Sequence, residues 1–326
     1  MSDITIRKKL FKYKEFHSTF ARPYMSLDSN QMLLVEELNC KIMSGKVSFE
    51  CVPCLCGSRI FDLIASVDRH LMLQNTVLCT ECGLIQSNPR MTTDEYANFY
   101  SSDFYRKCYE SGDYRSLYEN KYTPKEGRHI FDEINKAKDI TSSISVLELG
   151  AGGGWNLLVF KNAGAEVSGL DYSSNLVSLG RSHGINMMQG SVNEISGVFD
   201  VIIINHVLEH FLNPIESIKQ LIRHLKKDGV VYIGVPNIVN FSMGQIQNAH
   251  TYYFDPDTFK HYCAISGLNM VRFGVAEDVH MFGIFQAGEG DVVTISLKGH
   301  YKKMHNHIKN MMLKHYIKRF FLKRSI

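Results

Sequence analysis

The sequence predicts an α/β protein in which helices cover both faces of a mostly parallel β-sheet, with a small cysteine-rich lobe before it. Three observations support this prediction. Short apolar strands alternate with helical segments from residue 144 onward, a glycine-rich turn follows the first of these strands, and five of the eight cysteines fall within residues 51–82. Alternating strands and helices are typical of a parallel sheet, because each crossover between parallel strands needs a helix.

Length and composition fit one large core and a smaller one. The chain has 326 residues, of which 44% are hydrophobic and 21% are charged, as in ordinary globular proteins. Its apolar runs are far shorter than the roughly 20 residues of a membrane span. Lysines interrupt the first 30 residues, where an export signal would need an apolar stretch. We therefore expect a cytoplasmic protein.

Five regions are expected along the chain. In the first region, Asp28 or Ser29 can cap a helix that Gly45 ends. The regions are an N-terminal helical segment (1–50), a cysteine-rich lobe (51–90), a tyrosine-rich helical connector (91–140), the main domain (141–290) and a basic C-terminal helix or tail (291–326).

The main domain alternates strands with helices and closes on a hairpin. Apolar runs of strand length and helical periodicity decide the assignments. Strands are expected at residues 145–149, 165–170, 186–189, 199–204 and 230–235, helices at 155–163, 174–182 and 214–225, and the hairpin at 268–275 and 281–287.

A glycine-rich turn with two acids predicts the cofactor. Gly150, Gly152 and Gly154 follow the first strand, where glycine permits a tight turn and close approach of a ligand. Asp171 ends the second strand, 21 residues after Gly150, and can accept both hydroxyls of a ribose. Glu148 would repel the pyrophosphate of a dinucleotide but suits a cationic amino group or a sulfonium. The site therefore favours S-adenosylmethionine.

Three segments resemble the class I S-adenosylmethionine-dependent methyltransferases. Residues 148–154 resemble their motif I, residues 199–210 their fourth strand and the turn after it, and residues 228–237 their fifth strand. The resemblance implies a Rossmann-like, seven-stranded methyltransferase sheet. It also implies that the three glycines lie against the methionine moiety and that Asp171 binds the ribose.

The resemblance also assigns residues around the reaction cleft. Asn205 and His206 should border it. Where the family often has an acid that contacts the adenine, this chain has Gly190 and Ser191, so Ser191 takes that place in the expected site.

Two short cysteine pairs predict a metal site in the second region. Cys54 and Cys56 form one pair, Cys79 and Cys82 form the other, and a glycine follows each pair. Two such knuckles can place four sulfur atoms tetrahedrally, which suits a structural Zn²⁺ with no open coordination position. Cys51 could replace Cys54 or Cys56 as a ligand.

With this lobe, the chain resembles methyltransferases that carry an N-terminal zinc ribbon. That group includes deoxysugar C-methyltransferases and related enzymes of surface-glycan assembly. The group has a Glu-His pair where this chain has Ala249 and His250, and a tyrosine where it has Gln247. The departure makes O-methylation as good an expectation as C-methylation.

Histidines are the natural candidates for proton removal from the acceptor. Methyl transfer needs alignment above all, and a base that titrates near neutral pH helps it. His250 and His206 are the predicted catalytic groups, although His250 could instead anchor its loop, and His210 is expected to be structural. Tyr105 is a further candidate, to stack on a sugar or close over the cofactor.

Three functions remain open at this stage. The first is methylation of a sugar, either nucleotide-linked or part of a surface polysaccharide. The second is RNA methylation with the ribbon as the RNA contact. Against a nucleic-acid partner, residues 1–290 hold 27 basic and 32 acidic side chains, and the turn after the fourth strand lacks the Asn/Asp-Pro-Pro-aromatic motif used on base amines. The third is a non-catalytic module that binds S-adenosylmethionine.

The tail has the pattern of a basic amphipathic helix. Residues 291–326 contain nine lysines and arginines and one acid. Such a helix can rest on an anionic membrane surface, and the alternative is a terminal helix docked on the protein. Its apolar residues at helical spacing are Tyr301, Met304, Ile308, Met311, Met312, Tyr316 and Phe320.

Overall fold

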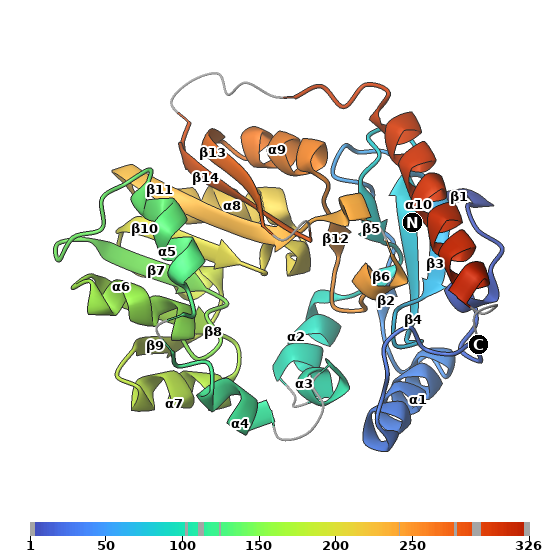
Figure 1. Cartoon of the computed structure of the whole chain (residues 1–326), viewed down its shortest axis with the longest axis horizontal. Coiled ribbons are helices and arrows are strands. Elements are labelled where there is room, and N and C mark those ends of the chain that lie inside the picture. Colours follow the sequence, from blue (N-terminus) through green and yellow to red (C-terminus); the bar gives the residue numbers. More distant parts are fainter. Residues whose placement is uncertain are drawn as a thin grey trace.

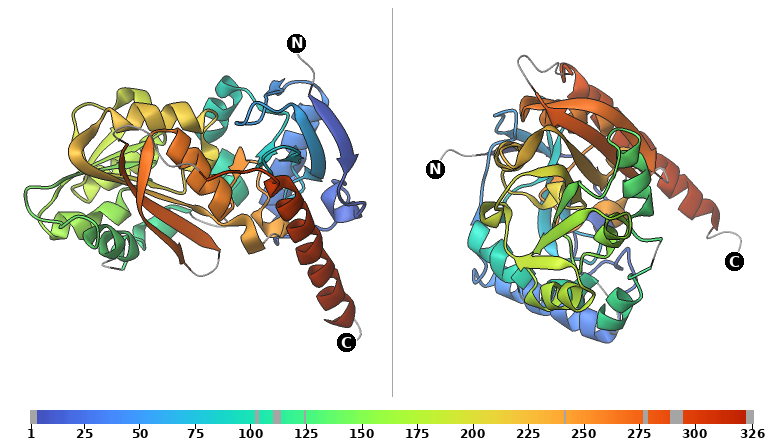
Figure 2. Two further views of the ribbon diagram at one scale, coloured as in Figure 1. Left: turned by 90° about the horizontal axis from the view of Figure 1, so that it is seen from above. Right: turned by 90° about the vertical axis from the view of Figure 1, so that its left-hand side faces the viewer.

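The computed structural model places a large α/β lobe beside a smaller β-rich lobe (Figure 1). The C-terminal helix projects along the small lobe, as the view from above shows (Figure 2). The structure describes residues 4–101, 104–109, 114–123, 125–240, 242–276, 279–288 and 295–322.

The large lobe is built on a seven-stranded sheet with the strand order β13-β14-β11-β10-β7-β8-β9. Neighbouring strands are parallel except that β14 is antiparallel to both β11 and β13. The predicted α/β fold with seven strands is therefore confirmed. The strands are β7 (Ser145–Leu149), β8 (Glu166–Asp171), β9 (Asn186–Gln189), β10 (Phe199–Asn205), β11 (Leu225–Pro236), β13 (Leu268–Ala276) and β14 (His280–Ala287).

Both faces of this sheet are buried, because successive residues of a strand point to opposite faces. Leu147 and Ile202 belong to one apolar cluster, whereas Val146 and Ile203 belong to the other. Helices cover the two faces: α5 (Arg128–Asn135), α6 (Leu158–Asn162), α7 (Ser174–Ser182), α8 (Pro214–Ile222) and α9 (Pro256–Ile265). Short 3-10 turns complete the lobe: η2 (Trp155–Leu157), η3 (Val192–Glu194), η4 (Leu208–His210), η5 (Ile238–Asn240) and η6 (Met243–Gln245).

Helix α9 is an element that the sequence analysis did not include, although its start carries clear signals. Asp255 caps the helix by accepting the N–H of Asp257, Pro256 stands in its first turn, and Thr258 completes a capping box. Two other predicted helices are shorter in the structure: 155–163 divides into η2 and α6, and 214–225 ends at Ile222 as α8.

The small lobe draws its sheet from three separate parts of the chain. The strand order is β1-β3-β4-β5-β12. The strands are β1 (Thr5–Lys9), β3 (Ile60–Val67), β4 (Leu73–Cys79), β5 (Ile85–Ser87) and β12 (Tyr252–Tyr253), and β2 (Phe49–Glu50) pairs separately with β6 (Arg90–Met91). Strand β1 from the predicted region 1–50 and strand β12 from the predicted region 141–290 both pair with strands of residues 51–90 and complete this sheet.

The tyrosine-rich connector forms helices, as predicted: α2 (Thr93–Ser101), α3 (Phe104–Tyr109) and α4 (Tyr114–Glu119). Tyr118 of α4 stacks on Trp155 of the large lobe, with ring centroids 5.2 Å apart and planes 7° apart. The connector therefore contacts the glycine-rich turn, since Trp155 follows it directly.

The first and last long helices both pack on the small lobe. Helix α1 (Ser29–Met43) has the predicted cap, because Asp28 accepts the N–H of Gln31; a short turn, η1 (Lys14–Phe16), precedes it. Helix α10 (His300–Leu322) buries Met304, Ile308 and Met312 in one cluster with apolar side chains of β3 and β4.

The docking of α10 bears on the expected membrane contact. Along residues 301–312 the apolar stripe covers the small lobe, which matches the alternative of a docked terminal helix. The side chains beyond Lys314, including Tyr316, Phe320 and the last four basic residues, lie outside those that the structure describes. Within the described part of the chain, no helix has the length and apolar character needed to span a membrane.

Candidate functional site

The glycine-rich turn and Asp171 meet at the C-terminal ends of β7 and β8. Asp171 accepts two backbone hydrogen bonds, from Gly152 N–H to Oδ2 at 2.8 Å and from Ser173 N–H to Oδ1 at 2.9 Å. These bonds fix the carboxylate against the turn and leave each oxygen a second lone pair. Asp171 therefore keeps acceptor capacity for the hydroxyls of a ribose.

Neighbouring protein groups also require glycine in this turn. Gly150 and Gly152 have φ values of 66° and 58°, which L-residues with a side chain rarely adopt. A Cβ on Gly150 would lie 2.4 Å from Val207, and one on Gly152 would lie 2.4 Å from the Trp155 ring. Gly154 also has a positive φ, 77°. The contact with Val207 places the turn after β10 directly against the glycine turn.

Glu148 is a buried carboxylate that lacks a partner on one side. It is 1% exposed; Asn156 Nδ2 donates to Oε1 at 2.7 Å, and Oε2 has no hydrogen bond in the described residues. Burial, together with the nearby Asp171 carboxylate, raises the pKa of Glu148 to about 8. A cationic amino group would satisfy Oε2, so the residues present fit the methionine end of S-adenosylmethionine.

The connector adds a cation to this site, which the sequence analysis did not include. Arg106 Nη2 lies 4.0 Å from Asp171 Oδ1, and Arg106 Nη1 donates to the Tyr118 hydroxyl at 2.6 Å. Helices α3 and α4 therefore supply a cation close to Asp171 and the hydroxyl that holds this cation. The only local signal was an arginine within an aromatic segment.

Two other expected cofactor residues also lie at strand ends. Asn205 ends β10, and its side chain lies over Gly234 of β11, the residue paired with it. Ser191 caps η3, and Glu194 Oε2 accepts both its N–H, at 2.6 Å, and its hydroxyl, at 2.7 Å. Their roles in cofactor binding remain predictions.

A polar cluster follows β10, and we call it the Glu209 cluster: Glu209, His206, His210, His250 and Tyr100. Glu209 is 1% exposed, and its Oε1 lies 3.5 Å from His206 Nδ1 and 3.9 Å from His210 Nε2. The rings of His210 and His250 are 4.9 Å apart at 85°. The structure thus brings together both predicted catalytic histidines. It adds Glu209, which the sequence analysis missed, and His210, which it treated as structural.

Electrostatics divides the roles within the Glu209 cluster. Burial alone would raise the pKa of Glu209, but the surrounding imidazoles outweigh it and lower the pKa to about 2. Burial and the neighbouring His210 lower the pKa of His250 to about 3. His250 is therefore neutral and a weak base, whereas the His206 side chain is 41% exposed and open to an acceptor. His206, with a φ of 56°, stands at the tip of the turn.

Tyr105 lies among aromatic rings behind the Glu209 cluster. Its ring centroid is 5.1 Å from that of Tyr100 and 5.0 Å from that of Tyr109. Tyr100 in turn donates its hydroxyl to the carbonyl oxygen of Ala249 at 2.9 Å. The structure therefore places Tyr105 where it supports Tyr100, and its catalytic role stays a prediction.

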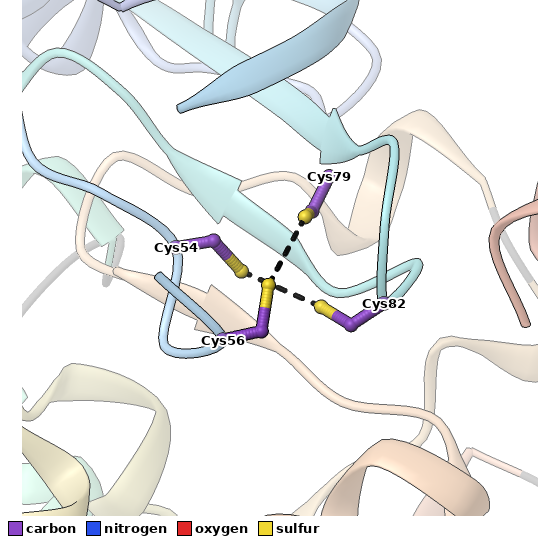
Figure 3. Close-up of side chains that lie close together, drawn as sticks. All are labelled: Cys54, Cys56, Cys79 and Cys82. Atoms are coloured by element: carbon purple, nitrogen blue, oxygen red, sulfur yellow. Dashed lines mark hydrogen bonds between the residues drawn. The ribbon is translucent and has the colours of Figure 1, made fainter. Parts of the chain in front are cut away.

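The four expected cysteines converge in the small lobe, with their sulfur atoms pointing toward one another (Figure 3). Their Sγ atoms lie within 4.8 Å of one another; the Cys54–Cys82 distance is 3.5 Å and the Cys56–Cys79 distance is 3.6 Å. Tetrahedral Zn–S bonds of about 2.3 Å place sulfur atoms about 3.8 Å apart, so the set fits Zn²⁺. Cys51 is exposed and lies outside this group.

Comparison with known proteins agrees with this geometry. A family described as a methyltransferase domain matches residues 121–272. The ubiquinone biosynthesis O-methyltransferase of Rickettsia canadensis (strain McKiel) is 27% identical over 117 residues, covering 33% of this chain and 50% of that protein. The protein of the same name from Rickettsia conorii (strain ATCC VR-613 / Malish 7) is 28% identical over 113 residues, covering 32% and 39%. The chain thus spans about half or less of the length of these relatives.

A solved structure shares the fold. It is the 1,6-didemethyltoxoflavin-N1-methyltransferase of Burkholderia thailandensis, with bound 1,6-didemethyltoxoflavin and S-adenosylhomocysteine. It is 17% identical, with a TM-score of 0.50, and the match covers 63% of this chain and 96% of that one. Fold, site and comparisons together show that the large lobe has the class I S-adenosylmethionine-dependent methyltransferase fold. The methyltransferase-domain match agrees with the predicted enzyme class.

Proposed function

We propose that the chain methylates a hydroxyl group of a sugar, either nucleotide-linked or part of a surface polysaccharide. The observation that carries this proposal is the contact between the glycine turn and the turn after β10, which sets an exposed histidine beside the cofactor loop. Oxygen rather than carbon is favoured because Ala249 stands where the resembling C-methyltransferases have a glutamate. The curated relatives are also named O-methyltransferases.

S-adenosylmethionine supplies an electrophilic methyl group on a sulfonium. The chain's own residues then have three tasks. Asp171 and Glu148 hold the ribose and the amino group, which fixes the direction of the methyl group. His206 accepts the proton of the acceptor hydroxyl, and Glu209 beside it stabilises the imidazolium that forms. Tyr100 and His210 brace the loop of Ala249.

The cysteine-rich lobe has a structural role in this proposal. Four thiolates would fill every position of a tetrahedral Zn²⁺, so the ion would hold the lobe and leave catalysis to the large lobe. Strand β12 and the Tyr262 hydroxyl, which donates to Cys82 Sγ at 3.2 Å, connect the lobe to the segment that carries His250. The ion would thereby fix one wall of the acceptor site.

A second acceptor class follows from the names of the relatives. A phenolic hydroxyl, as the name ubiquinone biosynthesis O-methyltransferase suggests for those proteins, would use the same histidine. The aromatic rings of Tyr100, Phe104 and Tyr105 could pack on such a ring. The polar Glu209 cluster favours the sugar, which presents several hydroxyls.

The acceptor is tested by a methyl-transfer screen on the full chain. We expect S-adenosylhomocysteine to form with a nucleotide sugar, and His206→Ala to lower kcat by about 10²–10⁴-fold, the usual contribution of a positioned base. His224→Ala, at a half-buried histidine beside the N-terminal end of β10, should leave kcat unchanged. Turnover with phenols only, or with RNA only, would contradict the sugar assignment.

Cofactor binding is tested separately at Asp171. Asp171→Ala should weaken S-adenosylhomocysteine binding by roughly 10- to 150-fold, because hydrogen bonds to a charged partner contribute about 1.5–3 kcal/mol. Calorimetric titration of the variant and the wild type measures this. Equal affinity in both proteins would show that the ribose does not lie at Asp171.

A further inference from the structure

We propose that Glu209, His210 and His250 bind a divalent metal ion at the acceptor side of the active site. The proposed role of the ion, activation of an acceptor hydroxyl, rests on the proposed function, whereas the site itself does not. The site is separate from the four cysteines, which lie in the small lobe. It uses a buried carboxylate and two imidazoles, none of which takes the proton of the acceptor hydroxyl in the reaction described above.

The three ligand groups already face one another. Each offers one atom, and these atoms lie within 4.8 Å of one another. Metal ligands at bond lengths of about 2.0–2.2 Å stand roughly 3–3.5 Å apart, so small side-chain rotations would close the set. Glu209 and His210 come from η4, and His250 comes from the loop before β12, so the fold brings two distant segments together here.

Glu209 is the strongest sign that a cation belongs in this site. It is 1% exposed, and neither carboxylate oxygen accepts a hydrogen bond from the described residues. The two imidazole nitrogens near Oε1, of His206 and His210, lie 3.5 and 3.9 Å away. A buried carboxylate without hydrogen bonds costs several kcal/mol, and proteins pair such a group or use it to coordinate a metal. Both of its oxygens have free lone pairs for the ion.

The tautomer of His210 turns a lone pair toward Glu209. Tyr100 has one hydroxyl proton and donates it to the carbonyl oxygen of Ala249, at 2.9 Å. His210 Nδ1 lies 2.8 Å from the Tyr100 oxygen and 2.9 Å from the same carbonyl, so a proton on Nδ1 satisfies this network. Nε2 of the neutral ring then presents a lone pair 3.9 Å from Glu209 Oε1. Two lone pairs that face each other call for a cation between them.

His210 is also oriented as metal-binding histidines are in known sites. A coordinating histidine usually donates its other N–H to a backbone carbonyl, which fixes the tautomer and the ring orientation. His210 does this through the carbonyl oxygen of Ala249. His250 is 5% exposed, and it offers one ring nitrogen to the same group of ligand atoms. Its ring lies between His210 and Tyr253.

The ligand set indicates which ion would bind. One carboxylate and two imidazoles suit borderline ions such as Zn²⁺, Mn²⁺, Fe²⁺ and Co²⁺, whereas Mg²⁺ and Ca²⁺ prefer oxygen ligands alone. Three protein ligands leave coordination positions open, as in catalytic metal sites. A sugar hydroxyl can occupy such a position.

The ion would lower the pKa of that hydroxyl. Its proton passes to His206, which remains outside the ligand set. The oxygen then forms a bond to the methyl carbon, the carbon–sulfur bond breaks, and its electron pair stays on sulfur as a neutral thioether. The ion keeps its charge throughout, so the step needs no oxidant or reductant.

The test is Mn²⁺ binding to the full chain with its cysteine site loaded with zinc, measured by electron paramagnetic resonance. Mn²⁺ is the probe because four thiolates have little preference for it. We expect one Mn²⁺ per chain in the wild type and at least about tenfold weaker binding in Glu209→Gln and His250→Gln. His224→Ala is the matched control and should bind Mn²⁺ like the wild type.

Binding of S-adenosylhomocysteine, measured in parallel, separates the two proposals. Retained binding in Glu209→Gln shows that the variant is folded. A wild type that binds S-adenosylhomocysteine but no Mn²⁺ overturns the metal site, as does equal Mn²⁺ affinity in wild type and Glu209→Gln. Mn²⁺ binding without sugar methylation supports the metal site and counts against the proposed acceptor alone.

Discussion

Cys82→Ser is expected to lose zinc and to unfold the small lobe, whereas the wild type should contain close to one zinc per chain. The physical reason is that metal binding and folding are coupled: a structural Zn²⁺ contributes roughly 10–16 kcal/mol of apparent binding free energy in small zinc domains. Cys82 is buried, and its Sγ lies 3.5 Å from Cys54 Sγ. The same sulfur accepts a hydrogen bond from the Tyr262 hydroxyl. A serine hydroxyl cannot replace the thiolate ligand.

Elemental analysis and thermal unfolding followed by circular dichroism measure this effect. Cys51→Ser is the matched control, because Cys51 is exposed, close in sequence and outside the sulfur group. It should keep its zinc and its unfolding temperature. A Cys82→Ser protein that is metal-free but melts like the wild type would show that the lobe needs no ion. Loss of zinc from Cys51→Ser would show that the ligand set is wrong.

Local patterns carried most of the sequence prediction. The strands of the large sheet are short apolar runs between turn residues, so their positions could be predicted within a few residues, and β9 and α7 match residue for residue. The cysteine knuckles are local too: Gly57 and Gly83 adopt φ values of 87° and 72° and close turns back to Cys54 and Cys79. Such signals depend only on neighbouring residues.

Contacts between distant segments could not be predicted in this way. The pairing of β1 with β3 joins Thr5 to Ile60, and the pairing of β12 with β5 joins Tyr252 to Gln86. Neither β1 nor β12 has a local sequence feature that indicates which strand it pairs with. The helical spacing of the tail predicted α10, but it could not show that Ile308 packs on the small lobe rather than on a membrane.

The candidate site also combines residues with a local sequence signal and residues that only the fold brings together. Glu148 and Asp171 were predictable because Glu148 is the next-to-last residue of β7 and Asp171 ends β8, each at a fixed distance from the glycine turn. The Glu209 cluster was only half predictable, since His250 reaches it from a segment 40 residues after His210. Sequence favoured His250 as the base. The structure favours His206, because burial makes His250 a weak base and leaves His206 open.

Glu148→Gln is expected to stabilise the protein at alkaline pH while it weakens cofactor binding. The pKa of Glu148 is about 8 in the folded protein, against an ordinary value of 4.5. Between these values the folded state binds the proton more tightly than the unfolded state. The contribution of Glu148 to the free energy of unfolding is therefore fully present below about pH 4.5 and is lost as the pH rises through about 8. Glutamine removes this loss.

The expected change in the free energy of unfolding follows from the raised pKa of Glu148. The difference between the two pKa values corresponds to at most roughly 4–5 kcal/mol, and relaxation of the site will reduce it to about 2–3 kcal/mol. Denaturant unfolding should therefore show Glu148→Gln more stable than the wild type near about pH 8.5 and equal to it near about pH 4.5. Glu166→Gln, an exposed change on β8, is the matched control and should follow the wild type at both values.

The affinity of the wild type for the cofactor should increase as the pH rises, whereas its stability decreases. The amino group of the cofactor is a cation, so its binding favours ionised Glu148 and must release the proton that the free site holds below about pH 8. Wild-type binding of S-adenosylhomocysteine should therefore tighten as the pH rises from about 6 to about 8.5, with proton release visible as a buffer-dependent heat in calorimetry. In Glu148→Gln the release should vanish and the affinity should fall about tenfold or more, the cost of a hydrogen bond to a charged group. The same pH dependence in both proteins would mean that another group titrates, and Glu148 Oε2 would then not be the partner of the amino group.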